Sequence, residues 1–228
     1  MQYPRIPELY SIDDQYLIGS DLLVKPVTSP GVTSSEIMFP AFDRWYDVTT
    51  MQLMKGTGGA DTVIQVTVGS DIDTIPVYQR GGSIIARKLR LRRSSHLMTN
   101  DPYTLYVALG CDLKADGSLY MDDETTFDHE KRKDFGIASF HSSWVDNIAL
   151  QNSAIIGNNE SVTTAMDLNN RIVERIIVMG VPAEPREIRV KSHASPLDFE
   201  YNAESKVLVI RKPLVSARNQ WTIAIIKN

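Results

Sequence analysis

The sequence predicts an all-β fold built from two antiparallel β-sandwich domains. Short apolar runs follow one another between turn residues, and no stretch shows a convincing helical pattern. Within these runs apolar and polar residues alternate, most clearly from Val63 to Val68, which indicates strands with one buried and one solvated face. The length of 228 residues is enough for two cores, since a domain usually needs roughly 100 to 150 residues.

The expected strands lie in order along the chain, each bounded by Gly, Pro, Asp, Asn or Ser. We expect them at residues 35–39, 43–48, 62–68, 75–79, 82–88, 103–109, 117–123, 135–143, 173–181, 187–192, 206–212 and 220–227. Gly81 and Gly82 are predicted to form a tight turn, and Asp116–Gly117 a hairpin turn with antiparallel neighbours. A polar stretch at 92–102 predicts the boundary between the two domains.

The segment "DDQYLIGSDLLVKPV", residues 13–27, departs from this alternation. Leu22, Leu23 and Val24 are consecutive and stand between Gly19 and Pro26, a pattern typical of a strand covered on both faces. Such strands belong to parallel sheets wrapped by helices, and the helices that a barrel would need are not predicted here. The segment therefore resembles the last piece of something larger.

Composition and charge exclude several classes of protein. A net charge of -4 argues against nucleic acid or an anionic membrane as main partner, because both select basic surfaces. No apolar run approaches the roughly 20 residues of a bilayer span. The N-terminus lacks the pattern of a secretory signal, so the chain as given is expected to be cytosolic. With Cys111 as the single cysteine, no intrachain disulfide is possible.

Several blocks in the same order resemble the C-terminal part of family 31 glycoside hydrolases. They are "IDDQYLIGSDLLVKPV", "RWYDVTT", "IPVYQRGGSIIARKLRLRRSS", "DPYTLYVAL", "GSLYMDDETTF" and "KVLVIRKP". The resemblance is closest to the branch that holds the glucosidase II α subunit and the neutral α-glucosidases. It implies the remnant of the last strand of a catalytic (β/α)8 barrel at residues 1–29, a proximal β-sandwich at 30–99 and a distal one at 100–228.

The resemblance also implies a function. The family hydrolyses α-glucosidic bonds with retention, which needs two carboxyl groups roughly 5 Å apart. The nucleophile motif of the family, W-x-D-M-N-E, does not occur in this sequence, so we expect no catalytic residue here and a non-catalytic region that braces the barrel. The complete protein would trim glucose from N-glycans in the lumen of the endoplasmic reticulum. Its partners would be its own barrel, a carbohydrate substrate and the β subunit of a glucosidase II; no cofactor is implied.

A stand-alone carbohydrate-binding module is the alternative interpretation. It would use the flat faces of aromatic side chains, of which Trp45, Tyr46, Trp144 and Trp221 are the candidates. Each of them lies in or beside an expected strand, where burial in a core explains it better.

The acidic candidates have structural explanations. Asp122, Asp123 and Glu124 would form a solvated strand end or turn, with weak calcium binding as the alternative. Relatives usually carry Gly at the position of Glu124. Asp13 and Asp14 are expected to cap or turn the backbone before the segment that contains Leu22.

The remaining candidates are weaker. The basic run 87–93 is expected to be an amphipathic strand with Leu89 and Leu91 on one face. The histidines have no zinc-ligand spacing; they are His96, His129, His141 and His193. Asn159 begins an N-glycosylation sequon, which would be used only in the secretory pathway.

Overall fold

The computed structural model describes residues 3–55, 57, 59, 63–69, 73–145, 148–156, 171–193 and 195–226. Their regular structure is almost entirely β, which confirms the predicted fold class. The helical elements in this part of the chain are single turns: η1 (Pro7–Leu9), η2 (Ser95–Met98) and α1 (Asp128–Lys131).

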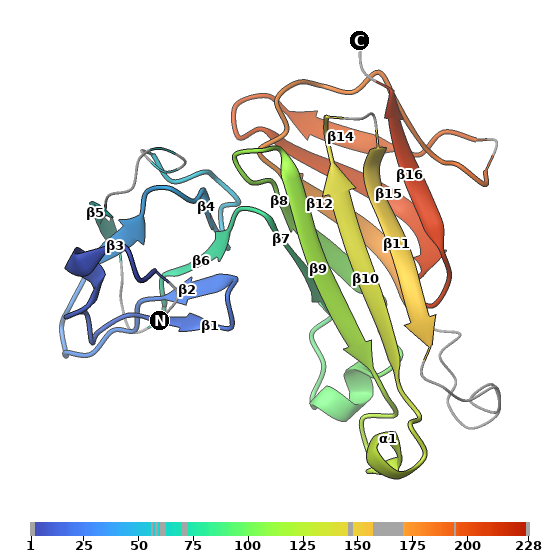
Figure 1. The fold of residues 1–228 in the computed structure, drawn as a ribbon, viewed down its shortest axis with the longest axis horizontal. Helices are drawn as coiled ribbons and strands as arrows, with labels where there is room; N and C mark the ends of the chain where they lie inside the picture. The colour runs from blue at the N-terminus through green and yellow to red at the C-terminus, as the bar shows by residue number, and fades with distance from the viewer. Residues whose placement is uncertain are drawn as a thin grey trace.

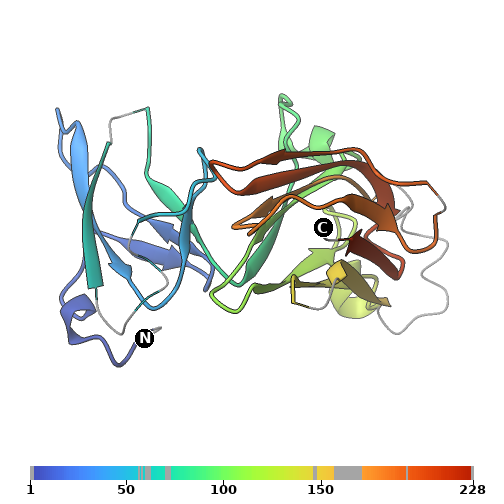
Figure 2. The same ribbon diagram turned by 90° about the horizontal axis from the view of Figure 1, so that it is seen from above.

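The strands form two bodies that lie side by side (Figures 1 and 2). The small unit, residues 3–80, contains a four-stranded sheet of order β1-β2-β6-β4 and a ribbon of β3 and β5. All its pairs are antiparallel. The strand bounds are Tyr16–Ile18 for β1, Leu22–Val24 for β2, Ser34–Pro40 for β3, Trp45–Asp47 for β4, Val63–Gly69 for β5 and Val77–Arg80 for β6.

Strand β2 explains the consecutive apolar residues near the N-terminus. It lies between β1 and β6, and Leu23 and Val24 are both buried, although they point to opposite faces of the sheet. Leu23 packs into the core of the small unit with Phe39 and Trp45. In this chain, β2 is the inner strand of an antiparallel sheet, covered on both sides.

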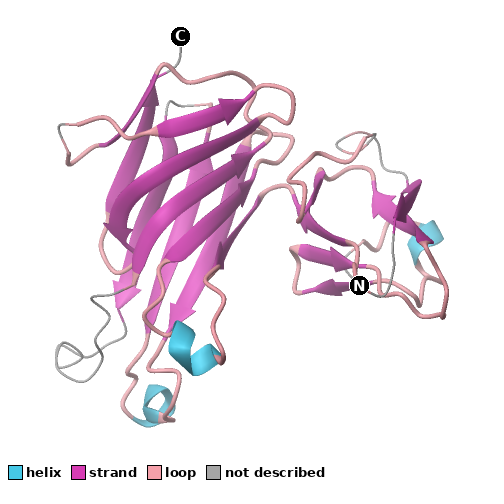
Figure 3. Cartoon of the chain, turned by 180° about the vertical axis from the view of Figure 1, so that it is seen from behind, coloured by secondary structure: helices cyan, strands magenta, loops and turns pink. Residues whose placement is uncertain are grey.

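The large sandwich, residues 83–226, is a ten-stranded sheet of order β13-β16-β11-β10-β9-β7-β8-β12-β15-β14. The sheet curls into two layers (Figures 2 and 3) around one core that holds residues from both, such as Leu105, Phe140 and Ile176. Its strand bounds are Ser83–Arg87 for β7, Tyr103–Ala108 for β8, Lys114–Met121 for β9, Gly136–Ser143 for β10, Ile148–Ile156 for β11, Ile172–Met179 for β12, Glu187–Val190 for β13, Phe199–Asn202 for β14, Val207–Ser216 for β15 and Trp221–Ile226 for β16.

The turn expected at Gly81–Gly82 is present. β6 ends at Arg80 and β7 begins at Ser83, while Gly82 has φ +90°, a conformation that glycine adopts without strain. The two flanking strands do not pair with each other. β6 joins β2 and β4, and β7 joins β8 and β9, so this turn carries the chain from one body to the other.

The hairpin turn expected at Asp116–Gly117 is wrong. Both residues lie inside β9, opposite His141 and Phe140 of β10. The chain turns at Gly110–Leu113 instead, and β7 lies between β8 and β9. A Cβ atom at residue 117 would stand 2.2 Å from the Ile84 carbonyl oxygen, so Gly117 is needed for the close approach of two strands.

The amphipathic strand expected over residues 87–93 is also wrong. β7 ends at Arg87, and the next residues have no strand structure. Leu91 is 99% exposed, so the alternation of Leu and Arg does not bury a leucine face. The basic side chains make separate ion pairs instead, namely Lys88 with Glu124, Arg90 with Glu174 and Arg92 with Asp101.

Candidate functional site

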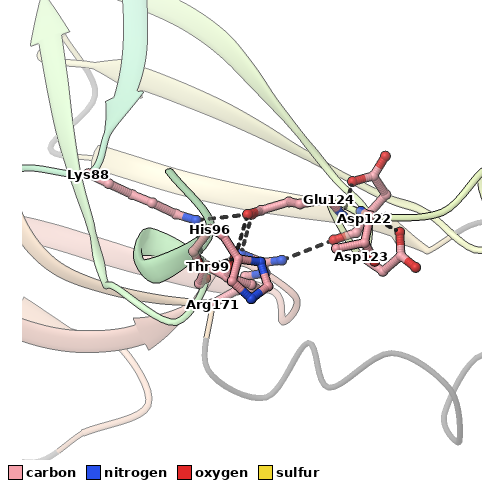
Figure 4. Close-up of polar contacts among 8 residues, drawn as sticks. Lys88, His96, Thr99, Asp122, Asp123, Glu124 and Arg171 are labelled. Atoms are coloured by element: carbon pink, nitrogen blue, oxygen red, sulfur yellow. Dashed lines mark hydrogen bonds and ion pairs between the residues drawn. The ribbon is translucent and has the colours of Figure 1, made fainter. Parts of the chain in front are cut away.

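The Asp122–Glu124 segment is a hydrogen-bonded turn directly after β9 (Figure 4). The backbone N–H of Glu124 donates to Asp122 Oδ1 at 2.8 Å. Those of Thr125 and Thr126 donate to Asp123 Oδ1 at 3.1 and 3.0 Å. The Thr126 hydroxyl donates to Asp123 Oδ2 at 2.6 Å, and this hydrogen bond is the main cause that lowers the pKa of Asp123 to about 2.

Glu124 is the centre of an ion cluster that joins four segments of the large sandwich. Its carboxylate accepts hydrogen bonds from Lys88 Nζ at 3.1 Å, Arg171 Nη1 at 2.9 Å and the Thr99 hydroxyl at 2.8 Å (Figure 4). Burial opposes ionisation of this carboxylate, but the hydrogen bonds from Thr99, Lys88 and Arg171 outweigh it and lower the pKa.

The backbone at Glu124 fits the glycine that the family resemblance implies there. Its φ is +59°, in the left-handed region where a residue with a Cβ atom is strained. Arg171, whose side chain is 5% exposed, also donates to the carbonyl oxygens of Thr99 and Asp122. The ion pairs hold Glu124 in a conformation that its own backbone preference disfavours.

These carboxylates are arranged for structure. General acid–base catalysis needs one carboxyl group that holds a proton near neutral pH, whereas the pKa values of Asp123 and Glu124 are both lowered. Within the described residues, no group of three or more His, Cys, Asp or Glu side chains is placed to hold a metal ion. The hydrogen bonds within Asp122–Thr126 agree with the turn interpretation.

The two N-terminal aspartates, Asp13 and Asp14, differ in their contacts. The carboxylate of Asp14 forms an ion pair with Lys25, whose side chain is 8% exposed. The pair joins the segment before β1 to the end of β2 and neutralises a buried cation. Asp13 has no such partner among the described residues.

The four candidate aromatic side chains are buried, as expected. Trp45, Tyr46, Trp144 and Trp221 are 0, 1, 3 and 7% exposed. Trp45 donates to the Pro40 carbonyl oxygen at 3.1 Å. None of the four presents a flat face to a sugar ring.

The histidines and the cysteine are dispersed over the molecule. His141 contacts Asp116 across β9 and β10, and His129 Nδ1 lies 3.8 Å from Asp122 Oδ2. Cys111 is a free, exposed thiol that donates to the Phe42 carbonyl oxygen at 3.6 Å. Asn159 lies outside the described residues.

An apolar surface at the N-terminal end of the small unit is the feature that sequence reasoning missed. Tyr10, Tyr16 and Ile18 are 51, 52 and 53% exposed, although each is a large apolar side chain. Beside them is a pocket of about 180 Å³, lined mainly by Tyr3, Leu9, Ile12, Leu17 and Leu23. We call these exposed residues and the pocket the β1 face. The alternation of Tyr16 and Ile18 in a three-residue edge strand was the available signal.

Comparison with known proteins gives this face a context. Residues 1–85 match the model of the glycosyl hydrolase family 31 C-terminal domain. Neutral alpha-glucosidase AB of Homo sapiens is 34% identical over 98% of this chain. The chain corresponds to the C-terminal region of family 31 glycoside hydrolases. It spans about a fifth of the curated relatives that it matches, 22% in the human case.

Solved structures of this family agree with the fold of both bodies. A crystal structure of the glucosidase II alpha subunit bound to alpha3-Glc2 superposes with a TM-score of 0.79 at 32% identity. The match covers 94% of this chain and 24% of the alpha subunit chain. A crystal structure of the ER glucosidase II complex of the catalytic subunit with the binding domain of the regulatory subunit gives a TM-score of 0.77, again at 32% identity. This match covers 94% of this chain and 23% of that chain.

No helix among the described residues is long and apolar enough to span a membrane.

Proposed function

We propose that this chain is the non-catalytic C-terminal region of an alpha-glucosidase and braces the catalytic barrel. The β1 face carries this proposal. It leaves Tyr16 and Ile18 about half exposed on an edge strand, beside an apolar pocket, and lies within the residues that match the family. Large apolar side chains that stay exposed beside an apolar pocket support a covered interface, and the barrel would be what covers them.

The complete protein would hydrolyse O-glycosyl bonds and trim glucose from N-glycans in the lumen of the endoplasmic reticulum, with a regulatory β subunit as partner. These finer statements are supported by the relatives named above, one of which is described as an ER heterodimer. The comparisons give no support to the cytosolic expectation.

The division into a barrel remnant at 1–29 and sandwiches at 30–99 and 100–228 is part of the proposal, with two changes. Because β1 pairs with β2, and β2 pairs with β6, which also pairs with β4, we assign residues 16–24 to the small unit. Because β7 pairs with β8, the boundary is better placed at Gly81–Gly82 than at residue 99.

The alternative of a stand-alone carbohydrate-binding module has no observation in its favour, because its four aromatic side chains are all in cores.

The test is to sequence the transcript upstream of Met1. We expect an open frame that continues in register with this one and encodes the W-x-D-M-N-E nucleophile motif. A stop codon in the same frame, with no upstream coding sequence, would overturn the proposal.

The bracing role has its own test in the longer product. Tyr16→Ser with Ile18→Ser should lower its melting temperature and its α-glucosidase activity after mild heating. The matched control is Leu91→Ser, which removes a 99% exposed leucine far from the β1 face. Equal behaviour of the two variants would contradict bracing through this face.

A further inference from the structure

The seam between the small unit and the large sandwich is tightly built. The Tyr46 hydroxyl donates to the Leu109 carbonyl oxygen at 2.7 Å. Tyr46 shares a buried cluster with Tyr106 and Met179 of the large sandwich. A Cβ atom at residue 180 would stand 2.2 Å from the Tyr46 hydroxyl oxygen, so only glycine fits there. The two bodies therefore present a defined surface where they meet.

A cleft of about 390 Å³ opens along this seam. Small-molecule sites usually lie in clefts of roughly 300–1,000 Å³, often between domains. Both bodies contribute to its lining: Arg44, Leu53 and Lys55 come from the small unit, and Leu113, Pro182 and Lys206 from the large sandwich.

Hydrogen bonds hold the backbone at two of the three cationic residues of the cleft. The carbonyl oxygen of Lys206 accepts hydrogen bonds from the N–H groups of Gly180 and Val181 at 3.0 and 2.9 Å. The carbonyl oxygen of Arg44 accepts one from Gly81 at 2.7 Å. Two of the three cationic side chains of the cleft, Arg44 and Lys206, thus extend from hydrogen-bonded backbone positions.

The cleft has an excess of positive charge in a protein of net charge -4. Arg44, Lys55 and Lys206 form no ion pair with a carboxylate of the described residues. Glu204 is the carboxylate in the lining, so two positive charges are left uncompensated. Like charges gathered in a cleft repel each other and attract an anion.

We propose that the seam cleft binds a small organic phosphate, a class that goes beyond the proposed bracing function. A phosphate monoester carries about 1.5 to 2 negative charges at pH 7, which matches the excess charge of the cleft. Its organic part would contact Leu53, Leu113 and Pro182, which are apolar. Because its contacts come from both bodies, such a ligand stabilises them against separation.

Calorimetric titration of the full chain at low salt tests this proposal. Glucose 6-phosphate is the probe, inorganic phosphate tests the anion alone, and glucose is the neutral control. We expect glucose 6-phosphate to bind more tightly than inorganic phosphate and glucose to show no binding. Absence of binding by glucose 6-phosphate at millimolar concentration, or equal binding of glucose, would overturn the proposal.

Two double variants locate the site. Lys55→Gln with Lys206→Gln should weaken binding at least tenfold and abolish the rise in melting temperature that the ligand causes. The control, Lys131→Gln with Lys191→Gln, removes the same charge from exposed positions of the large sandwich and should leave binding unchanged. Equal weakening by both would show a non-specific charge effect. If the first variant has a lower melting temperature without ligand, the exposed Lys55→Gln alone must still weaken binding.

Discussion

The small unit and the large sandwich are both antiparallel β structures, yet they differ in how far each can stabilise itself. Among the described residues, the core of the large sandwich contains 23 buried residues, whereas the core of the small unit contains five, Leu23, Ile37, Phe39, Trp45 and Tyr78. The small unit also exposes Tyr10, Tyr16 and Ile18. Since stability comes mainly from buried apolar area, the small unit depends on its neighbours and the large sandwich much less.

The difference teaches where a function can be placed. The large sandwich buries Phe140, Trp144 and Trp221 in its core. It also pairs Glu124, Asp101 and Glu174 with cations. The small unit leaves large apolar side chains exposed at the β1 face, and its Arg44 and Lys55 line the seam cleft. A unit with a small core, exposed apolar side chains and cations without ion pairs is suited to join two larger bodies.

The largest expected effect on stability comes from removing one large side chain from each core in turn. Phe140→Ala and Phe39→Ala both remove a phenylalanine that is at most 1% exposed, which typically costs about 3–5 kcal/mol. We expect Phe39→Ala to melt the small unit first and leave the large sandwich folded. Phe140→Ala should destabilise the whole chain. Calorimetry should show two transitions for Phe39→Ala; a single shifted transition for both variants would show that the two bodies unfold as one.

A smaller effect isolates the seam. Gly180→Ala places a Cβ atom against the Tyr46 hydroxyl at φ +83°, whereas Gly19→Ala has a similar φ of +61° and no neighbour within 4 Å. Both suffer backbone strain, but only the first forces the seam apart, so Gly180→Ala should cost about 1–3 kcal/mol more. Urea unfolding measures the difference. If both variants lose the same free energy of unfolding, the seam accommodates the added Cβ atom and the two bodies are only loosely packed.

The ion cluster around Glu124 gives the large sandwich a pH dependence. Because the folded-state pKa of Glu124 lies below its ordinary value of 4.5, its contribution to stability is present above that pH and is lost as the pH falls through the folded value. Glu124→Gln should therefore cost about 1–2 kcal/mol at pH 7 and flatten the loss of stability below pH 4.5. Unfolding curves at a series of pH values provide the measurement, with Glu174→Gln, which leaves Glu124 intact, as control. If Glu124→Gln leaves the loss of stability at acid pH unchanged, ionisation of Glu124 is not the cause of that loss.

The smallest effect on stability concerns the β1 face. Deleting residues 1–28 would remove β1 and β2 and with them Leu23 from the core, so truncation is a poor test. Tyr16→Ser with Ile18→Ser removes exposed apolar area instead. We expect less self-association in sedimentation experiments and a change in unfolding free energy below about 0.5 kcal/mol. Association that persists unchanged would show that the β1 face is not the surface responsible.

Much of the fold was predictable because alternation in a strand such as β10 indicates one buried face directly. What the sequence did not show was pairing between distant strands. Asp116–Gly117 has the chemistry of a turn, but its glycine serves the close approach of Ile84 on β7, a contact 33 residues away in sequence. The basic run beside β7 alternates like a strand, yet its cations are held by Glu124, Asp101 and Glu174, which no local pattern reveals.

The candidate sites divide in the same way. The burial of Trp45, Tyr46, Trp144 and Trp221 and the turn at Asp122–Glu124 follow from local context, and both were expected. The seam cleft was not, because Lys206 is far in sequence from Arg44 and Lys55 and lines the same cleft only where the two bodies meet.

The central proposal is that this chain is the non-catalytic region of an alpha-glucosidase and does no glycosidic chemistry itself. Its most direct test is the release of p-nitrophenol from p-nitrophenyl α-glucoside by the purified chain. We expect no release above a buffer blank, because the pKa values of Asp123 and Glu124 are both lowered, so neither carboxyl group holds a proton near neutral pH. Turnover that survives repurification and disappears in Asp122→Asn or Asp123→Asn would contradict it.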